Sequence, residues 1–376
     1  MSTPHQAPDH VIVIGGGIFG ASTTEQLARK GVRTTWVTSG TLADGASGRT
    51  LAWLNSAGFR SEPYHRIRLE GISRWRDFAA RVPGSQDYLR FHGGLTWAKP
   101  GQSHKERYRY ERAHDYVSAW LSPEQVPGTV AAVDPAAVDP EGAIFNADEG
   151  WVDLPSVIAE LRTEIETYGV TEIIENAGRC VPVVEGGRAV GVLTGTGQRI
   201  DADAVVLATG PQTPGILDEL KVPMGDDSPA AFVAFTKPLD HGLTSVLNTP
   251  RVAIRPAVDG GLVMDSGWSE RAMTVDEDGT PHVSDEVVTT LLQEATAVLA
   301  GHPELELDHI GMGYKPIPGD GEPVIGETDD VAGLYVAFSH SGATQGLVMG
   351  ELIADEVVGG QVSELTLPFR PGRYKA

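Results

Sequence analysis

Residues 10–30 read HVIVIGGGIFGASTTEQLARK, and this stretch decides the fold. Its first part, residues 11–14, is a continuous β-branched run, which is typical of a parallel strand buried on both faces. Gly15, Gly17 and Gly20 follow in the spacing G-x-G-x-x-G, and a helical pattern comes next. The first glycine permits a tight turn, the second lets the backbone approach a pyrophosphate, and the third lets the helix pack on the strand. Strand, turn and helix together predict a dinucleotide site at the helix N-terminus.

The composition indicates an acidic globular chain. It has 376 residues, which is enough for two interleaved domains with sizeable cores, and 41% of them are hydrophobic. It contains 29 lysines and arginines and 51 aspartates and glutamates, so the formal net charge is −22. Such a surface repels phosphates, and we therefore expect no nucleic-acid partner.

The cysteine content and the N-terminus limit the possibilities further. Cys180 is the single cysteine, which excludes an intramolecular disulfide and argues against a cysteine-based zinc site, so we expect no metal. Residues 1–10 contain no apolar leader, and no apolar run approaches about 18 residues, the length of a spanning helix. We expect a cytoplasmic protein with no membrane span.

The second strand of this unit ends without the acidic residue that dinucleotide folds commonly place there. Residues 32–38 have the strand pattern, and Thr38 and Ser39 stand where a carboxylate usually holds the ribose. The next loop, residues 44–55, reads DGASGRTLAWLN and allows close backbone approach through its small residues. It carries one hydroxyl and one cation suited to a pyrophosphate, although an ordinary glycine-rich loop would look the same.

Two later stretches also have the pattern of a buried strand followed by a turn of small residues. Residues 203–211, DAVVLATGP, predict a buried strand that ends in an Ala-Thr-Gly turn. Residues 333–346, GLYVAFSHSGATQG, predict a strand and a glycine-rich turn before a long helix. The N-terminus of that helix would stabilise negative charge, although a generic strand, turn and helix is the alternative.

The four segments GGGIFG, GASGR, ATG and SGATQG, in this order, resemble the FAD-dependent D-amino-acid oxidase, glycine oxidase and sarcosine oxidase superfamily. The resemblance implies an α/β fold in which a Rossmann-like FAD-binding domain of the glutathione-reductase type is interleaved with an α+β substrate domain on an antiparallel or mixed sheet. We assign residues 1–91, 149–215 and 310–376 to the FAD-binding domain. Residues 92–148 and 216–309 form the substrate-binding domain in this assignment.

The resemblance also implies which residues contact the FAD. They belong to the turns described above and to the start of one further strand: Gly15, Gly17, Ile18, Gly20, Thr38, Ser39, Ala46, Ser47, Arg49, Thr50, Leu51, Val181, Ala208, Thr209, Gly210, Gly342, Ala343, Thr344, Gln345 and Gly346.

The implied activity is oxidation of a carbon–nitrogen bond of an amino acid or amine by hydride transfer to flavin N5, with Tyr314, Lys315 and His340 as the candidate catalytic residues. Lys315 stands where family members often place a carboxylate-binding arginine, but a solvated lysine beside prolines is the alternative. The sarcosine oxidase branch attaches FAD through a cysteine near this segment, whereas Cys180 lies far away in the sequence, so we expect non-covalent FAD. That branch also has an oxygen-activating lysine in a strand comparable to residues 261–265, which contain none.

Two other functions fit the same sequence. One is an FAD-dependent 2-hydroxy-acid dehydrogenase, and the other is a flavin-carrying subunit of a larger electron-transfer complex. The substrate, the electron acceptor and the oligomeric state stay open at this point.

Overall fold

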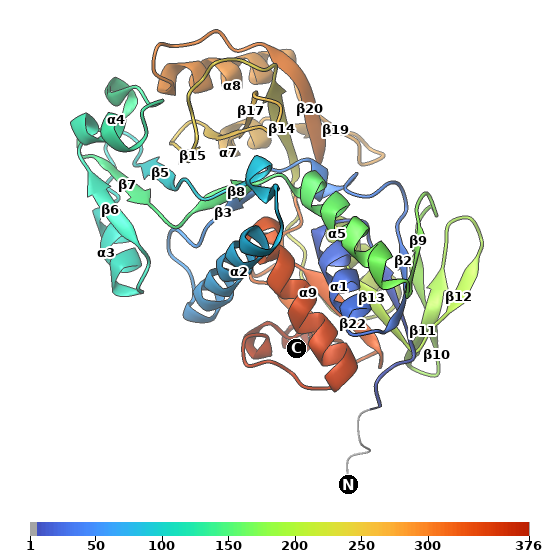
Figure 1. The fold of residues 1–376 in the computed structure, drawn as a ribbon. Helices are drawn as coiled ribbons and strands as arrows, with labels where there is room; N and C mark the ends of the chain where they lie inside the picture. Colours follow the sequence, from blue (N-terminus) through green and yellow to red (C-terminus); the bar gives the residue numbers. More distant parts are fainter. Residues whose placement is uncertain (1–5, 376) are drawn as a thin grey trace.

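The computed structural model describes residues 6–375, and its largest elements are two sheets (Figure 1). The first sheet has six strands in the order β21-β22-β13-β1-β2-β9. Its adjacent strands are parallel except for β21 and β22. These strands are β1 (His10–Ile14), β2 (Arg33–Val37), β9 (Thr171–Ile174), β13 (Ala204–Leu207), β21 (Val324–Glu327) and β22 (Leu334–Phe338).

The central strand β1 is buried on both faces, as its sequence predicts. Val11 and Val13 belong to the core formed with helices α1 (Ile18–Arg29), α5 (Leu154–Tyr168) and α9 (Gly342–Gly359). Ile12 and Ile14 belong to a second core on the other face. That core is shared with a three-stranded antiparallel sheet of β10 (Val181–Glu185), β11 (Arg188–Leu193) and β12 (Arg199–Asp201).

Helix α2 (Glu62–Arg81) packs against α9 and carries residues that later line the site. Ser61 caps the start of this helix, because its hydroxyl accepts a hydrogen bond from Tyr64 N at 3.3 Å. Asp153 caps α5 in the same way, accepting from Ser156 N at 3.1 Å. Both caps satisfy backbone donors that would otherwise have no partner within the helix.

The second sheet has eight strands in the order β20-β14-β17-β16-β15-β5-β7-β6 (Figure 1). Its pairs are antiparallel except for β15 with β5. Helix α8 (Asp285–Val298) and the short α4 (Val126–Thr129) contribute to its core, and α3 (Lys105–Ala113) lies beside β6. The strands are β5 (Gly94–Trp97), β6 (Ser118–Leu121), β7 (Ala143–Asn146), β14 (Ala230–Thr236), β15 (Val246–Asn248), β16 (Ala253–Pro256), β17 (Leu262–Asp265) and β20 (Leu307–Tyr314).

The predicted domain boundaries do not all coincide with the ends of elements. Residue 310 falls inside β20, and the residues of β20 up to Tyr314 pair with β14 in the eight-stranded sheet. Residue 215 falls inside α6 (Thr213–Glu219). A small sheet of β3 (Trp53–Leu54), β4 (Leu89–Arg90) and β8 (Gly150–Val152) lies where the chain passes between the two large sheets. Within residues 6–375, the helices are too short or too polar to cross a membrane.

Candidate active site

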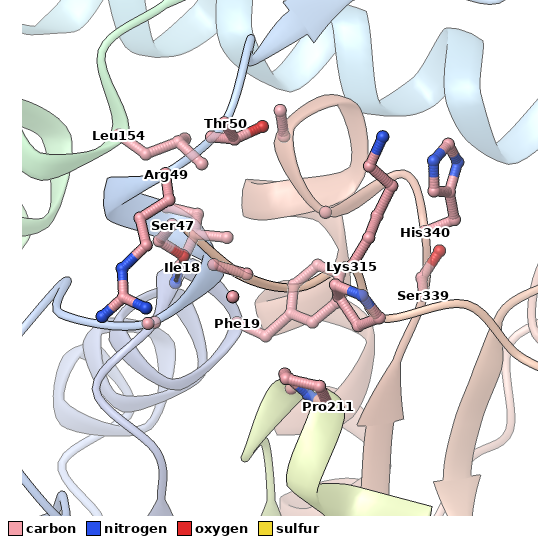
Figure 2. Close-up of a pocket in the computed structure, with 18 of the residues that line it drawn as sticks. Ile18, Phe19, Ser47, Arg49, Thr50, Leu154, Pro211, Lys315, Ser339 and His340 are labelled. Atoms are coloured by element: carbon pink, nitrogen blue, oxygen red, sulfur yellow. Dashed lines mark hydrogen bonds between the residues drawn. The ribbon is translucent and has the colours of Figure 1, made fainter. Parts of the chain in front are cut away.

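A cavity of about 850 Å³ is lined by both large sheets and by the turns that follow β1, β13 and β22. The predicted catalytic residues Tyr314, Lys315 and His340 all line it. The predicted cofactor residues line it as well, with the exception of Gly20, Val181, Gln345 and Gly346. Segments that are far apart in the sequence therefore meet around one space (Figure 2).

The three glycines of the first turn each meet a different physical constraint. Gly15 has φ +127°, and a Cβ there would lie 2.2 Å from the carbonyl oxygen of Ala208. A Cβ on Gly20 would lie 1.9 Å from the carbonyl oxygen of Gly15, so Gly20 serves the packing of α1 on its own strand. Gly17 lines the cavity, where a Cβ would meet only the Ser47 hydroxyl, at 3.1 Å.

The helices that follow the first and the last glycine-rich turns, α1 and α9, begin without a side-chain cap. Gly17, which has no side chain, precedes α1, and within residues 6–375 the side chain of Ser341 accepts no hydrogen bond from the first turn of α9. The free backbone donors and the helix dipole therefore favour negative charge at both places. At α1 one donor is used within the chain, because Ile18 N donates to the Ser47 hydroxyl at 3.0 Å.

Arg49 connects the loop after β2 to β20 (Figure 2). Its guanidinium donates to the carbonyl of Met312 at 2.6 Å and to the carbonyl of Asp44. Its aliphatic part fills the space over Gly311, where a Cβ would lie 3.0 Å from Arg49 Cγ. Arg49 therefore forms part of the cavity wall, and its guanidinium lies beside β20.

Cys180 is far from the predicted site in sequence but lines the cavity in space. It follows residues whose backbones bond to the end of the second strand, since Ala177 N donates to Thr38 O and Gly178 N to Ser39 O, each at 3.0 Å. The Cys180 thiol thus lies at the Thr38 end of the cavity. Burial raises its pKa, which keeps the sulfur as a thiol rather than a reactive thiolate.

Two predicted cofactor residues that do not line the cavity, Gln345 and Gly346, are packed inside the protein near the start of α9. A Cβ on Gly346 would lie 2.6 Å from Ile18 Cγ1, so this glycine allows α9 to approach α1. The Gln345 side chain is fully buried, and within residues 6–375 its amide makes no hydrogen bond.

At the other end of the cavity, Lys315 lies in a cluster with two acids. Its ammonium pairs with Glu270, from α7 (Gly267–Arg271), and lies 4.0 Å from the Asp265 carboxylate at the end of β17. Burial lowers the pKa of Lys315, but the two carboxylates outweigh burial and raise it. Burial raises the pKa of Asp265 to about 6 despite the nearby ammonium. Because Lys315 already pairs with Glu270, it is less available to a substrate carboxylate than the sequence analysis assumes.

His340 lies next to Lys315 and projects from the turn after β22 (Figure 2). Burial lowers its pKa to about 3, and the charges of Lys315, Arg68 and Arg60 act in the same direction. The imidazole is therefore neutral at pH 7. Tyr314 lines the cavity too, but its hydroxyl donates to Gly279 O at 2.8 Å in the loop between β18 (Thr274–Val275) and β19 (Pro281–His282).

Sequence reasoning missed six charged residues of the cavity: Asp44, Arg60, Arg68, Asp226, Asp265 and Glu270. None of them carries a local sequence pattern that separates it from ordinary surface charges.

Comparison with known proteins identifies the family. The family model for FAD-dependent oxidoreductases, DAO, matches residues 10–356. The chain belongs to this family. FAD is therefore its cofactor, and the chain is an oxidoreductase, as the sequence predicts.

Individual relatives align over nearly the whole chain. A glycine oxidase of Pseudomonas aeruginosa is 25% identical and covers 96% of this chain and 98% of its own length. One of the subunits of an opine oxidase from Agrobacterium tumefaciens is 22% identical, and the match covers 97% of both chains. The crystal structure of glycine oxidase from Geobacillus kaustophilus superposes with a TM-score of 0.82 at 20% identity and covers 98% of this chain and 99% of the other. The last similarity confirms the predicted α/β fold.

Proposed function

We propose that this oxidoreductase oxidises the carbon–nitrogen bond of an amino acid or amine by hydride transfer to FAD. One observation carries the proposal: a single cavity joins the glycine-rich turns to a polar end that contains Lys315, Asp265 and His340. Two glycine oxidases among the similar proteins support the same substrate class.

The residues of the cavity fit FAD. The uncapped start of α1 suits the pyrophosphate, and the uncapped start of α9 suits the flavin pyrimidine edge. Ser47 adds a hydroxyl beside Gly17, and Arg49 adds a cation where the cavity meets β20. In this arrangement the six-stranded sheet holds the cofactor and the eight-stranded sheet closes the substrate side, which is the predicted division into two domains.

FAD supplies the chemistry by accepting a hydride from the substrate carbon. The chain's own residues bind and orient the substrate and exclude water. A substrate that arrives as an ammonium ion must lose a proton to become the neutral amine before the hydride leaves, and Asp265 is ionised above a pH of about 6 and can accept that proton. His340, with a pKa of about 3, stays neutral and acts as a hydrogen-bond partner in this proposal.

The test is an anaerobic screen that follows flavin absorbance while amino acids, amines and 2-hydroxy acids are added. We expect at least one amine-bearing compound to bleach the visible absorbance of the oxidised flavin and 2-hydroxy acids to leave it unchanged. Bleaching by hydroxy acids alone would refute carbon–nitrogen oxidation.

A second function is a flavin-carrying component of a larger complex. The relative from Agrobacterium tumefaciens is named as one of the subunits of an opine oxidase and aligns over 97% of both chains. The same screen separates the two functions: a component of such a complex would be reduced only after its partner chains are added.

A further inference from the structure

Three arginines line the cavity, and none of them forms an ion pair with an acid in residues 6–375. Arg49 donates to the backbone carbonyls of Asp44 and Met312, whereas Arg60 and Arg68 both lie at the ring of Tyr64. The buried Arg255, by contrast, has an acid partner, because its guanidinium lies 3.8 Å from the Asp153 carboxylate. Burying a cation without an opposite charge is costly, so two neighbouring cations without an acid partner favour the binding of an anion.

Arg68 is held rigidly and only 3% exposed. Its Nε and Nη2 donate to the backbone and side-chain oxygens of Asn55, each at 2.8 Å, and its Nη1 donates to the Ser341 hydroxyl. All three acceptors are neutral. Arg68 therefore keeps its full positive charge beside the start of α9.

Arg60 has the opposite character, since its donors are free. Its side chain makes no hydrogen bond within residues 6–375, and its Nε is buried without a partner. The guanidinium lies 5.9 Å from the centre of the Tyr64 ring, and that of Arg68 lies 5.4 Å from the same ring. Burial and the charge of Arg68 lower the pKa of Arg60 to about 10, which still leaves it charged at pH 7. A guanidinium with free donors next to a second fixed cation has the geometry of a carboxylate receptor.

Lys315 differs from both arginines, because Glu270 and Asp265 already surround its ammonium. The positive charges of Lys315, Arg60 and Arg68 all lower the pKa of His340, so the lysine and both arginines lie within electrostatic range of this imidazole. Near His340, the charge without an acid partner within residues 6–375 is thus that of Arg60 and Arg68 and not that of Lys315.

We infer that Arg60 binds the carboxylate of the substrate, with Arg68 as a fixed second cation, and that the substrate is therefore a carboxylate-bearing amino acid and not a simple amine. The inference rests on the proposed function, because it places the reacting substrate in this cavity. Arg60 contacts the substrate directly, whereas Arg68 is a positioning residue that acts through its charge and through Ser341.

The first experiment measures binding without turnover. The holoenzyme is titrated with acetate, with acetamide as the neutral isostere, at constant ionic strength held by sodium chloride, and the flavin difference spectrum is recorded. The parent, Arg60→Gln, Arg60→Lys and Arg66→Gln are compared; Arg66 is an exposed arginine on α2, which begins just after Arg60, and gives a matched loss of charge. We expect Arg60→Gln to weaken acetate binding roughly tenfold to hundredfold, Arg60→Lys to weaken it less, and Arg66→Gln to match the parent.

The inference is overturned if acetate produces no saturable signal in the parent, or if Arg60→Gln and Arg66→Gln bind acetate equally. The flavin content of each variant shows whether the protein is folded. If Arg60→Gln does not fold, Arg60→Lys still tests the inference.

The second experiment separates this inference from the proposed function. Anaerobic flavin reduction is followed with glycine, alanine and proline and with their decarboxylated counterparts methylamine, ethylamine and pyrrolidine. A loss in Arg60→Gln that is confined to the amino acids supports the inference. Equal reduction of parent and variant by both sets would remove Arg60 from the site while leaving carbon–nitrogen oxidation intact. Absence of any reduction would refute the proposed function, and the acetate titration would still decide the role of Arg60.

Discussion

Asp265→Asn should change how the stability of this protein depends on pH. The Asp265 carboxyl ends β17, its side chain is 17% exposed, and burial raises its pKa from 3.8 to about 6. The folded state therefore holds a proton on Asp265 more tightly than the unfolded state does. As the pH rises through the interval between these values, the folded protein acquires a buried negative charge, and the free energy of unfolding falls.

The size of this effect follows from the two pKa values. A difference of about two pKa units corresponds to about 3 kcal/mol at 1.36 kcal/mol per unit. Asparagine keeps the shape of the side chain but never ionises. The stability of Asp265→Asn relative to the parent should therefore rise by up to about 3 kcal/mol between pH 4 and pH 7 and stay constant above that.

Urea unfolding in saturating FAD, at pH values from 4 to 8, measures this difference. Asp218→Asn removes an exposed carboxyl from α6 and serves as the matched control. A difference between Asp265→Asn and the parent that is flat with pH, or that falls as the pH rises, would refute the reasoning about Asp265.

Three further outcomes are expected. Gly17→Val should abolish FAD binding without unfolding the protein, because its Cβ would meet only the Ser47 hydroxyl while the side chain occupies cavity space; full flavin occupancy in a folded variant would contradict this. Acid precipitation should release the yellow chromophore into the supernatant, since the Cys180 sulfur lies at the Thr38 end of the cavity and burial keeps it protonated by raising its pKa; colour in the pellet would show a covalent bond. Thr38→Glu should leave FAD affinity similar or higher, because a carboxylate commonly holds the ribose at this position; a large loss in a titration of apoprotein would show that Thr38 meets a different group.

The sequence predicted the elements whose signals are local. The β-branched run of β1, the glycine spacing after it and the buried strand before residue 210 each specify structure within a few residues. The turns after β1, β13 and β22 meet at the cavity because the carboxyl ends of parallel strands lie at one edge of a sheet. The domain boundary at residue 310 stays a prediction; it falls inside β20, and the pairing of β20 with β14 up to Tyr314 has no local signal in the sequence.

The charged end of the cavity could not be predicted in the same way. Lys315, Asp265 and Glu270 come from different elements, and their mutual effect on pKa depends on tertiary distances. Sequence assigned a substrate carboxylate to Lys315 because it lacked the information that Glu270 pairs with this lysine. That assignment stays a prediction, as does the role of Arg60, which the acetate titration decides.

The distribution of charge in the cavity also bears on how a substrate would be oriented. Arg60 and Arg68 bring to the cavity two cations that have no acid partner within residues 6–375, and Asp265 and Glu270 bring two acids that share Lys315. If Arg60 holds the carboxylate and the amine of the amino acid lies near Asp265, the ionised Asp265 can take its proton. Losing the arginine contact would then misplace the reacting carbon as well as weaken binding. Arg60→Gln should accordingly lower the limiting rate of flavin reduction by an amino acid as well as its affinity. A change in affinity alone would show that Arg60 attracts the substrate without orienting it.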